Sequence, residues 1–204
     1  HRARLILEDI AELVFNKDWS SASELFASLT TSTEIKVIQT AEPGPFSQAI
    51  SGLDMAMWDL MSRKAGLPLC RALNPNAPLS VPVYASGIQI DDASSMIPAA
   101  RDAGFSAFKV KVGFDSKIDA EKLCALKQDL HPTERLMADA NQGWTVDEAT
   151  NFLKAIIDID LTWLEEPIRA DAAKDAWQQS AMNYNTPLAG GENLLGDAAF
   201  TRAI

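Results

Sequence analysis

Four short apolar segments recur at a nearly even interval, and they constrain the fold more than any other feature of this sequence. They lie at residues 108–113, 137–141, 163–167 and 188–193. The ionisable residues that end them are 26 to 28 positions apart, about the length of one strand, one helix and two loops in a parallel βα repeat. The spacing therefore predicts an α/β fold whose successive strands present polar groups at their carboxyl ends, as in a (β/α) barrel.

Two lysines alternate with apolar residues in the first segment. Residues i and i+2 of a strand share a face, so Lys109 and Lys111 point one way and Phe108, Val110 and Val112 the other. We expect the apolar face to pack under helices and the lysines to face the barrel interior. Neighbouring ammonium groups lower each other's pKa, and a lysine with a lowered pKa can act as a base. The alternative is an edge strand whose lysines are solvated.

Three acidic positions follow the later segments. Asp139, one of Glu165 and Glu166, and Glu192 end successive strands, so they would converge at the barrel mouth. Three carboxylates repel one another unless a cation lies between them, and all-oxygen ligation suits a hard ion such as Mg²⁺. Alternation along the strand does not choose between Glu165 and Glu166. Each acid taken alone could instead be a strand-end or helix-cap carboxylate.

The order and spacing of these motifs resemble those of the enolase superfamily, and more narrowly its mandelate racemase and muconate-lactonizing enzyme family. The motifs are Lys-Val-Lys at 109–111, Asp-Ala-Asn at 139–141, Glu-Glu-Pro at 165–167 and Gly-Glu-Asn at 191–193. A further segment, 49–68, is similar to the family's signature for the last helix of its capping domain. The resemblance implies an enolase-superfamily (β/α) barrel, of which about the first five βα units are present, and the helical part of an α+β capping domain.

The resemblance also implies a reaction and roles for single residues. Relatives abstract the proton α to a carboxylate through an enediolate, with Mg²⁺ as the metal, and Mn²⁺ is an alternative. Lys111 would be the base, and Lys109 would lower its pKa and contact the substrate carboxylate. Asp139, Glu165 and Glu192 would bind the metal. Relatives that read Glu-Gln-Pro keep only the first acid, which favours Glu165 over its neighbour.

Two further residues are weaker candidates for substrate binding. Asn141 shares a face with Asp139 and could touch substrate or a metal-bound water, although an asparagine here could instead cap the next turn. Ser86 is expected at the end of the first strand. Relatives also carry a His–Asp pair on later strands, for which this sequence has no counterpart. His131, beside Pro132, is expected on the surface at the other end of the barrel.

The Gly-Glu-Asn motif favours one part of the family. It resembles the mandelate racemase and acid-sugar dehydratase group, so we expect a lyase or isomerase, a dehydratase or racemase of a hydroxy acid. A muconate-type cycloisomerase or a dipeptide epimerase is the alternative. A second alternative is a partial barrel without catalytic activity. The sequence does not identify the substrate beyond a small carboxylate.

The predicted elements divide into two domains. Residues 1–76 form the helical part of the N-terminal capping domain, and residues 77–204 form the first part of the catalytic barrel. The first domain is expected to hold helices between 4 and about 30, the second of them short, and a longer helix after the break at 42–45. Strands are expected at 81–86, 106–112, 135–140, 161–165 and 187–191.

Composition excludes several classes of function. The 204 residues carry a net charge of −10, which argues against nucleic acids and anionic membranes as partners. Two isolated cysteines cannot form a disulfide framework, no apolar run approaches a membrane span, and the N-terminus does not resemble a signal peptide. We therefore expect a cytoplasmic enzyme, and a homo-oligomer. A whole barrel needs ~250 residues, so we expect these residues to be part of a chain of roughly 350 or more residues that includes the capping domain.

Overall fold

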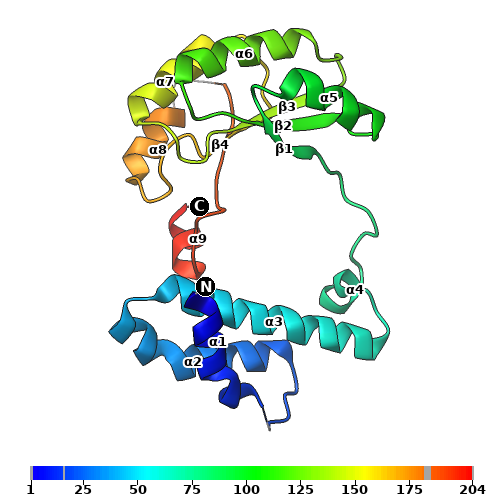
Figure 1. Ribbon diagram of the computed structural model, residues 1–204, viewed down its shortest axis with the longest axis vertical. Coiled ribbons are helices and arrows are strands. Elements are labelled where there is room, and N and C mark those ends of the chain that lie inside the picture. Colours follow the sequence, from blue (N-terminus) through cyan, green and yellow to red (C-terminus); the bar gives the residue numbers. More distant parts are fainter. Residues whose placement is uncertain (1, 16, 182–184, 204) are drawn as a thin grey trace. The chain divides into compact units, whose positions relative to one another are not determined.

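The computed structural model describes residues 2–15, 17–181 and 185–203, and it divides into two compact units (Figure 1). These are His1–Val81 and Pro82–Ile204. The sequence placed its boundary between residues 76 and 77, five positions earlier, and the two domain ranges stay a prediction. None of the helices in the described residues has the length and apolarity that a membrane span requires.

The first unit is helical. Its elements are α1 (Arg2–Val14), α2 (Ala22–Thr40), α3 (Pro43–Ala65) and α4 (Leu69–Leu73). Its core is formed by buried apolar residues of the first three helices: Ile6, Ile10, Leu25, Leu29, Phe46, Ala49 and Ile50. The predicted break at 42–45 is the start of α3, since Pro43 lies in its first turn, where a missing N–H costs nothing.

Helix α2 corrects the sequence prediction, because it has 19 residues and is not short. It begins after Ser21, whose side chain accepts a hydrogen bond from the backbone N–H of Glu24. Its later half is rich in threonine, a poor helix former. The hydroxyls of Thr30, Thr33 and Thr40 each donate to a carbonyl one turn earlier, which satisfies them within the helix.

The second unit is a five-stranded parallel sheet in which one helix follows each strand. The strands are β1 (Ala85–Gln89), β2 (Ala107–Lys111), β3 (Arg135–Asp139), β4 (Leu164–Glu165) and β5 (Leu188–Ala189). The helices are α5 (Ala93–Asp102), α6 (Ser116–Gln128), α7 (Val146–Ala155), α8 (Lys174–Ala181) and α9 (Asp197–Ala203). The strands lie in the order β1-β2-β3-β4-β5. The predicted βα order, that of the first five units of a (β/α) barrel, is therefore confirmed.

Strand β1 differs most from its prediction. It was expected at 81–86 but spans Ala85–Gln89, so Ser86 lies near its beginning. Ala85 pairs with Phe108 and Ile88 with Val110, which leaves one extra residue in β1, a bulge. Gly87 lies in that bulge with a φ of +77°, a conformation that favours glycine.

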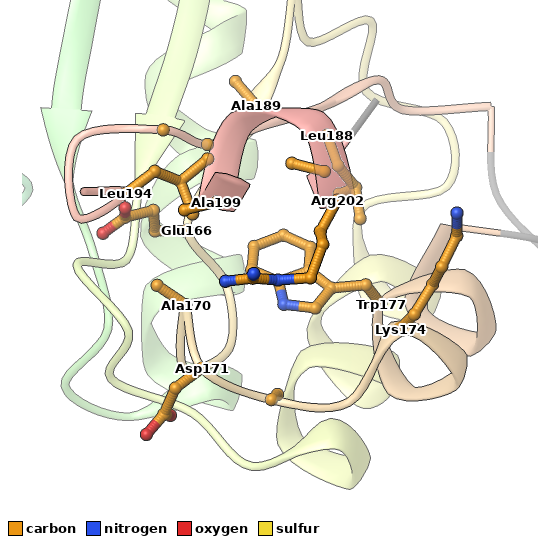
Figure 2. A pocket seen from close by; sticks show the side chains of 14 residues that line it. Glu166, Ala170, Asp171, Lys174, Trp177, Leu188, Ala189, Leu194, Ala199 and Arg202 are labelled. Carbon is orange, nitrogen blue, oxygen red and sulfur yellow. The ribbon is translucent and has the colours of Figure 1, made fainter. Parts of the chain in front are cut away.

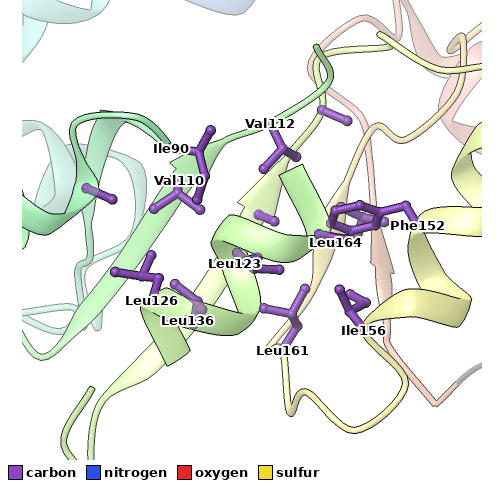
Figure 3. Packing of buried hydrophobic residues seen from close by; sticks show 14 of the residues in the cluster. Ile90, Val110, Val112, Leu123, Leu126, Leu136, Phe152, Ile156, Leu161 and Leu164 are labelled. Atoms are coloured by element: carbon purple, nitrogen blue, oxygen red, sulfur yellow. The ribbon is translucent and has the colours of Figure 1, made fainter. Parts of the chain in front are cut away.

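The core between the sheet and the helices follows the predicted alternation (Figure 3). Phe108, Val110 and Val112 of the β2 segment are buried, as expected. They belong to one core with Leu123 and Leu126 of α6, Phe152 of α7 and Ile156 directly after α7. Each large apolar side chain buried here stabilises the fold by about 1.5–3 kcal/mol. Ile157, two residues after the end of α7, is exposed.

Two loops at the carboxyl end of the sheet pack directly on each other. Gly113, after β2, has a φ of +104°, and a Cβ there would lie 2.3 Å from the carbonyl oxygen of Ala140. The buried carboxylate of Asp119 accepts from the backbone N–H groups of Gly113, Phe114 and Asp115. The β2–α6 loop is therefore held against the end of β3.

Helix α7 begins at a capping box formed by Thr145 and Glu148. The Thr145 hydroxyl accepts from the Glu148 backbone N–H, and the Glu148 carboxylate accepts from the Thr145 backbone N–H in return. This reciprocal capping box fixes where the chain turns into α7 after the β3 loop.

A partly buried ion pair holds the amino end of the sheet. Arg101 of α5 donates two hydrogen bonds to the Glu134 carboxylate, at 2.6 and 2.9 Å, and the backbone N–H of His131 donates a third. The Arg101 hydrogen bonds outweigh the effect of burial and, with the His131 N–H, lower the pKa of Glu134 to about 2. The His131 side chain is exposed just before the amino end of β3, as predicted.

We expect Glu134→Gln to destabilise the protein in a pH-dependent manner. The folded pKa of Glu134 lies below the unfolded value, so its contribution is present above about pH 4.3 and is lost as pH falls towards 2. At pH 7 the substitution should lower the free energy of unfolding by on the order of 1–3 kcal/mol. Urea denaturation across this pH range measures the difference, with exposed Glu121→Gln as control. A deficit that does not shrink on acidification would contradict the assignment.

Candidate active site

The site is built where the strands end. Strand pairing aligns one residue from each strand in a single row: Gln89, Lys111, Asp139, Glu165 and Ala189. All five lie at the carboxyl ends of their strands. Three of the predicted site residues therefore lie next to one another across β2, β3 and β4.

Lysines and carboxylates form a hydrogen-bonded network in this row. Lys111 Nζ donates to Asp139 Oδ2 at 2.6 Å and to Asn141 Oδ1 at 2.6 Å. Lys109 Nζ donates to Glu165 Oε2 at 2.8 Å and lies 3.4 Å from Asp139 Oδ2. Asp139 and Lys109 are both buried. Because β2 is paired on both sides, the alternative of an edge strand with solvated lysines is wrong.

The charges in this network set the pKa values of its members. Burial disfavours the Lys109 ammonium, but the hydrogen bond to Glu165 and the charges of Glu165 and Asp139 together raise its pKa. Burial likewise disfavours the Asp139 carboxylate, but the Lys111 hydrogen bond and the Asn141 backbone N–H lower its pKa. The expectation that the two lysines lower each other's pKa is therefore wrong for Lys109, since carboxylates lie within reach of its ammonium.

Two aromatic residues that were not predicted as site residues, Trp163 and Tyr84, contact the lysine–carboxylate network. The indole Nε1 of Trp163 donates to Glu165 Oε2 at 3.1 Å, the same oxygen that accepts from Lys109. Tyr84 packs edge-to-face on Trp163 with ring centroids 5.5 Å apart, and Lys109 Nζ lies 5.5 Å from the Tyr84 centroid. Trp163 precedes Glu165 by two residues, so strand alternation predicts a shared face and could have identified it.

The second acid of the Glu-Glu-Pro motif has a different environment from the first. Glu166 is buried, and both of its carboxylate oxygens accept from Asn193 Nδ2, at 3.0 and 2.8 Å. Glu165 instead accepts from Lys109 and Trp163. The two neighbouring carboxylates thus have separate partners.

The third acid lies outside the lysine–carboxylate network. Glu192 follows β5 by three residues and is exposed. In the part of the chain that the structure describes, no three acidic, histidine or cysteine side chains are grouped closely enough to hold a metal ion. The structure thus brings Asp139 and Glu165 together around Lys109 and leaves Glu192 apart. The assignment of these three residues as metal ligands stays a prediction.

The two weaker candidates lie in different settings. Asn141 contacts Lys111 through its side chain and Asp139 through its backbone N–H. The cap of α7 is Thr145, so Asn141 belongs to the network and not to the helix start. Ser86 is exposed in the β1 bulge, whereas the end of β1 is Gln89. Substrate contacts of Asn141 and Ser86 stay predictions.

A cavity of about 550 Å³ lies beside β5 and α8 (Figure 2). Its lining includes Trp177, Lys174, Asp171 and Arg202, and Glu166 at one side. The members of the lysine–carboxylate network do not line it. It therefore reaches the row of strand ends only at Ala189 of β5.

Comparison with known proteins relates this geometry to a family. A family model described as enolase C-terminal domain-like matches residues 93–204, more than half of the chain. The chain belongs to the enolase C-terminal domain-like family. Its sheet and helices accordingly form the first part of that family's (β/α) barrel, as the sequence motifs predicted.

Curated members of the enolase superfamily are similar over most of this chain. A 3,6-anhydro-α-L-galactonate cycloisomerase from Streptomyces coelicolor is 38% identical over 157 residues, which cover 74% of this chain and 43% of that protein. An L-talarate/galactarate dehydratase from Salmonella typhimurium is 30% identical over 193 residues, which cover 92% of this chain and 47% of that protein. The chain thus spans about half the length of the curated relatives that it matches.

Solved structures of the same superfamily have the same arrangement of elements. A mandelate racemase/muconate lactonizing enzyme from Bordetella bronchiseptica superimposes with a TM-score of 0.92 at 41% identity, covering 100% of this chain and 56% of that one. An L-talarate dehydratase from Polaromonas, crystallised with Mg and L-glucarate, superimposes with a TM-score of 0.80 at 26% identity. That match covers 98% of this chain and 56% of the Polaromonas chain.

Removing the central carboxylate should destabilise the barrel half of the molecule. We expect Asp139→Ala to lower the free energy of unfolding by about 2–4 kcal/mol, because it leaves Lys109 and Lys111 without their shared buried partner. Urea denaturation of the metal-free protein measures this loss. Asp158→Ala, at an exposed position before β4, is the matched control. A loss no larger than that of the control would mean that the network does not hold the strand ends together.

Proposed function

We propose that the protein is an enzyme that abstracts the proton α to a carboxylate group, acting as a dehydratase or racemase of a hydroxy acid. The observation that carries the proposal is the single row in which Lys111, Asp139 and Glu165 end adjacent strands. A base and acidic groups on one edge of a sheet are what this reaction needs. Every named relative reported above belongs to a superfamily of lyases and isomerases.

The two lysines differ in accessibility, which supports different roles. The side chain of Lys111 is 25% exposed and that of Lys109 is 9% exposed. Lys111 can therefore approach a substrate from the barrel mouth and, in its neutral form, take the α-proton on Nζ. Lys109 remains an ammonium because its pKa is raised, and a fixed positive charge suits contact with the substrate carboxylate.

The donor chemistry of the acidic residues suits a hard divalent cation, and Glu192 would have to approach the other two carboxylates to share it. Asp139, Glu165 and Glu192 offer only oxygen donors, and the buried Asp139 already requires positive charge beside it. We propose that these three residues hold Mg²⁺, as found in the Polaromonas dehydratase, with Mn²⁺ as a substitute. When bound, the cation would supply a Lewis acid that stabilises negative charge on the substrate carboxylate. Trp163 would hold the Glu165 carboxylate in place through its indole N–H.

A second candidate function has specific support. The Streptomyces relative at 38% identity is a cycloisomerase of an anhydro acid sugar, and a D-galactarolactone cycloisomerase from Agrobacterium fabrum is 31% identical over 163 residues. Cycloisomerisation also begins at the carbon next to a carboxylate. We therefore propose an acid sugar or a related hydroxy acid as substrate. Dehydration or racemisation is the favoured reaction, and cycloisomerisation is the alternative.

Exchange of the α-proton with solvent tests the proposed base. In the full-length protein with Mg²⁺, Lys111→Ala should abolish exchange of solvent deuterium into galactarate, talarate or mandelate on the face that Lys111 addresses. The substitution should leave metal binding intact. NMR in D₂O follows the exchange, with exposed Lys117→Ala as a matched control. If the Lys111 variant exchanges deuterium at the rate of the unaltered protein, Lys111 is not the base. If the unaltered protein itself shows no exchange, a barrel without catalytic activity is favoured.

A further inference from the structure

We propose that Glu166 and Asn193 act as a clamp that positions Glu192 for metal binding. Glu166 would be a positioning residue and not a ligand. This inference rests on the proposed function, since it assigns Glu192 to the metal. It also accounts for the two adjacent acids at the end of β4, which strand alternation alone could not tell apart.

The backbone of Glu166 is fixed from two sides. Its N–H donates to the carbonyl of Ala189 in β5 at 2.9 Å, and its carbonyl accepts from the N–H of Gln142 at 2.7 Å. Its φ is +40°, in the left-handed region that residues with a side chain rarely adopt. Such a conformation costs on the order of 1–3 kcal/mol and persists only where the surroundings determine it. Glu166 is therefore held rigidly between the ends of β3 and β5.

The side chain of Glu166 extends this rigidity to the next loop. Its carboxylate is buried, and a buried carboxylate needs hydrogen-bond donors. Asn193 Nδ2 lies within 3.0 Å of both carboxylate oxygens. Among the described residues no lysine, arginine or histidine forms an ion pair with Glu166. The contact with Asn193 is thus the means by which this carboxylate is satisfied inside the protein.

The loop that carries Glu192 has few other restraints. It contains Gly190 and Gly191 before Glu192 and Gly196 after it, and glycines allow many backbone conformations. The N–H of Leu194 donates to the carbonyl of Gly191 at 3.1 Å, which closes one turn around Glu192 and Asn193. With Asn193 anchored, the backbone of Glu192 is held by its neighbour, while its exposed carboxylate stays free to bind an ion.

The clamp makes one specific prediction about metal affinity. Loss of an outer partner of a metal ligand typically costs about 10–100-fold in affinity. We therefore expect Asn193→Ala to weaken Mn²⁺ binding about tenfold, measured by calorimetry on the full-length protein. Glu192→Gln should weaken binding more strongly than either Asn193→Ala or Glu166→Gln. Asn151→Ala, at an exposed asparagine on α7, controls for loss of an amide.

Hydrogen exchange of the metal-free protein supplies a readout that does not depend on the metal. Asn193→Ala should speed exchange of the backbone amides between residues 190 and 196 and leave those of β2 and β3 unchanged. Glu192→Gln should leave exchange in this segment unchanged, because it keeps the clamp. A general structural defect would instead speed exchange across the sheet as well.

The possible results separate the clamp from the ligand assignment. If Glu192→Gln weakens Mn²⁺ binding and Asn193→Ala does not, or if exchange between 190 and 196 is unchanged, the clamp is wrong while the metal site stands. If Glu192→Gln itself leaves affinity unchanged, Glu192 is not a ligand and both fail. If the Asn193→Ala variant does not fold, Glu166→Gln replaces it as the test. This substitution keeps the shape of the side chain and leaves one oxygen that can accept the hydrogen bond from Asn193. It should then give a smaller loss in the same direction, and no loss would overturn the clamp.

Discussion

A buried carboxylate between two lysines is the interaction on which the rest of the barrel half depends. Asp139 has no exposed side-chain surface, and its charge is tolerated because Lys111 donates to it and Lys109 lies within 3.4 Å. Both lysines come from β2, so the pairing fixes the register of β2 against β3. Glu165 then continues the pattern onto β4 through Lys109. The contacts that compensate the buried charge therefore also require the observed alignment of β2, β3 and β4.

The loops that follow the strand ends are also fixed in specific backbone conformations. In the second unit, the described non-glycine residues in left-handed conformations are Asn141, Gln142 and Glu166, all next to the row of strand ends. Such conformations are costly and concentrate at functional sites. Here each one turns a loop so that its backbone meets the neighbouring strand or loop. The result is a division of roles in which Glu165 faces the lysines and Glu166 faces the next loop.

Much of the fold was predictable because its signals are local. The even spacing of strand ends, the alternation around Lys109 and the Thr145 cap depend on residues close in sequence. The predictions that were wrong concern features that depend on contacts between residues far apart in the sequence. The span of β1 depends on a bulge set by its pairing with β2, and the raised pKa of Lys109 depends on carboxylates from two other strands. The contact between Glu166 and Asn193 depends on how a glycine-rich loop folds back, which no local pattern encodes.

The central claim is that the lysine–carboxylate row is the site of a metal-assisted proton abstraction. Anomalous diffraction from crystals of the full-length protein grown with Mn²⁺ tests it most directly. We expect one anomalous peak within ligand distance of the carboxylates of Asp139, Glu165 and Glu192, with Glu166 still hydrogen-bonded to Asn193. A peak that is bound by other residues, or a well-ordered protein with Lys109 and Lys111 still paired to Asp139 and no peak at all, would contradict it.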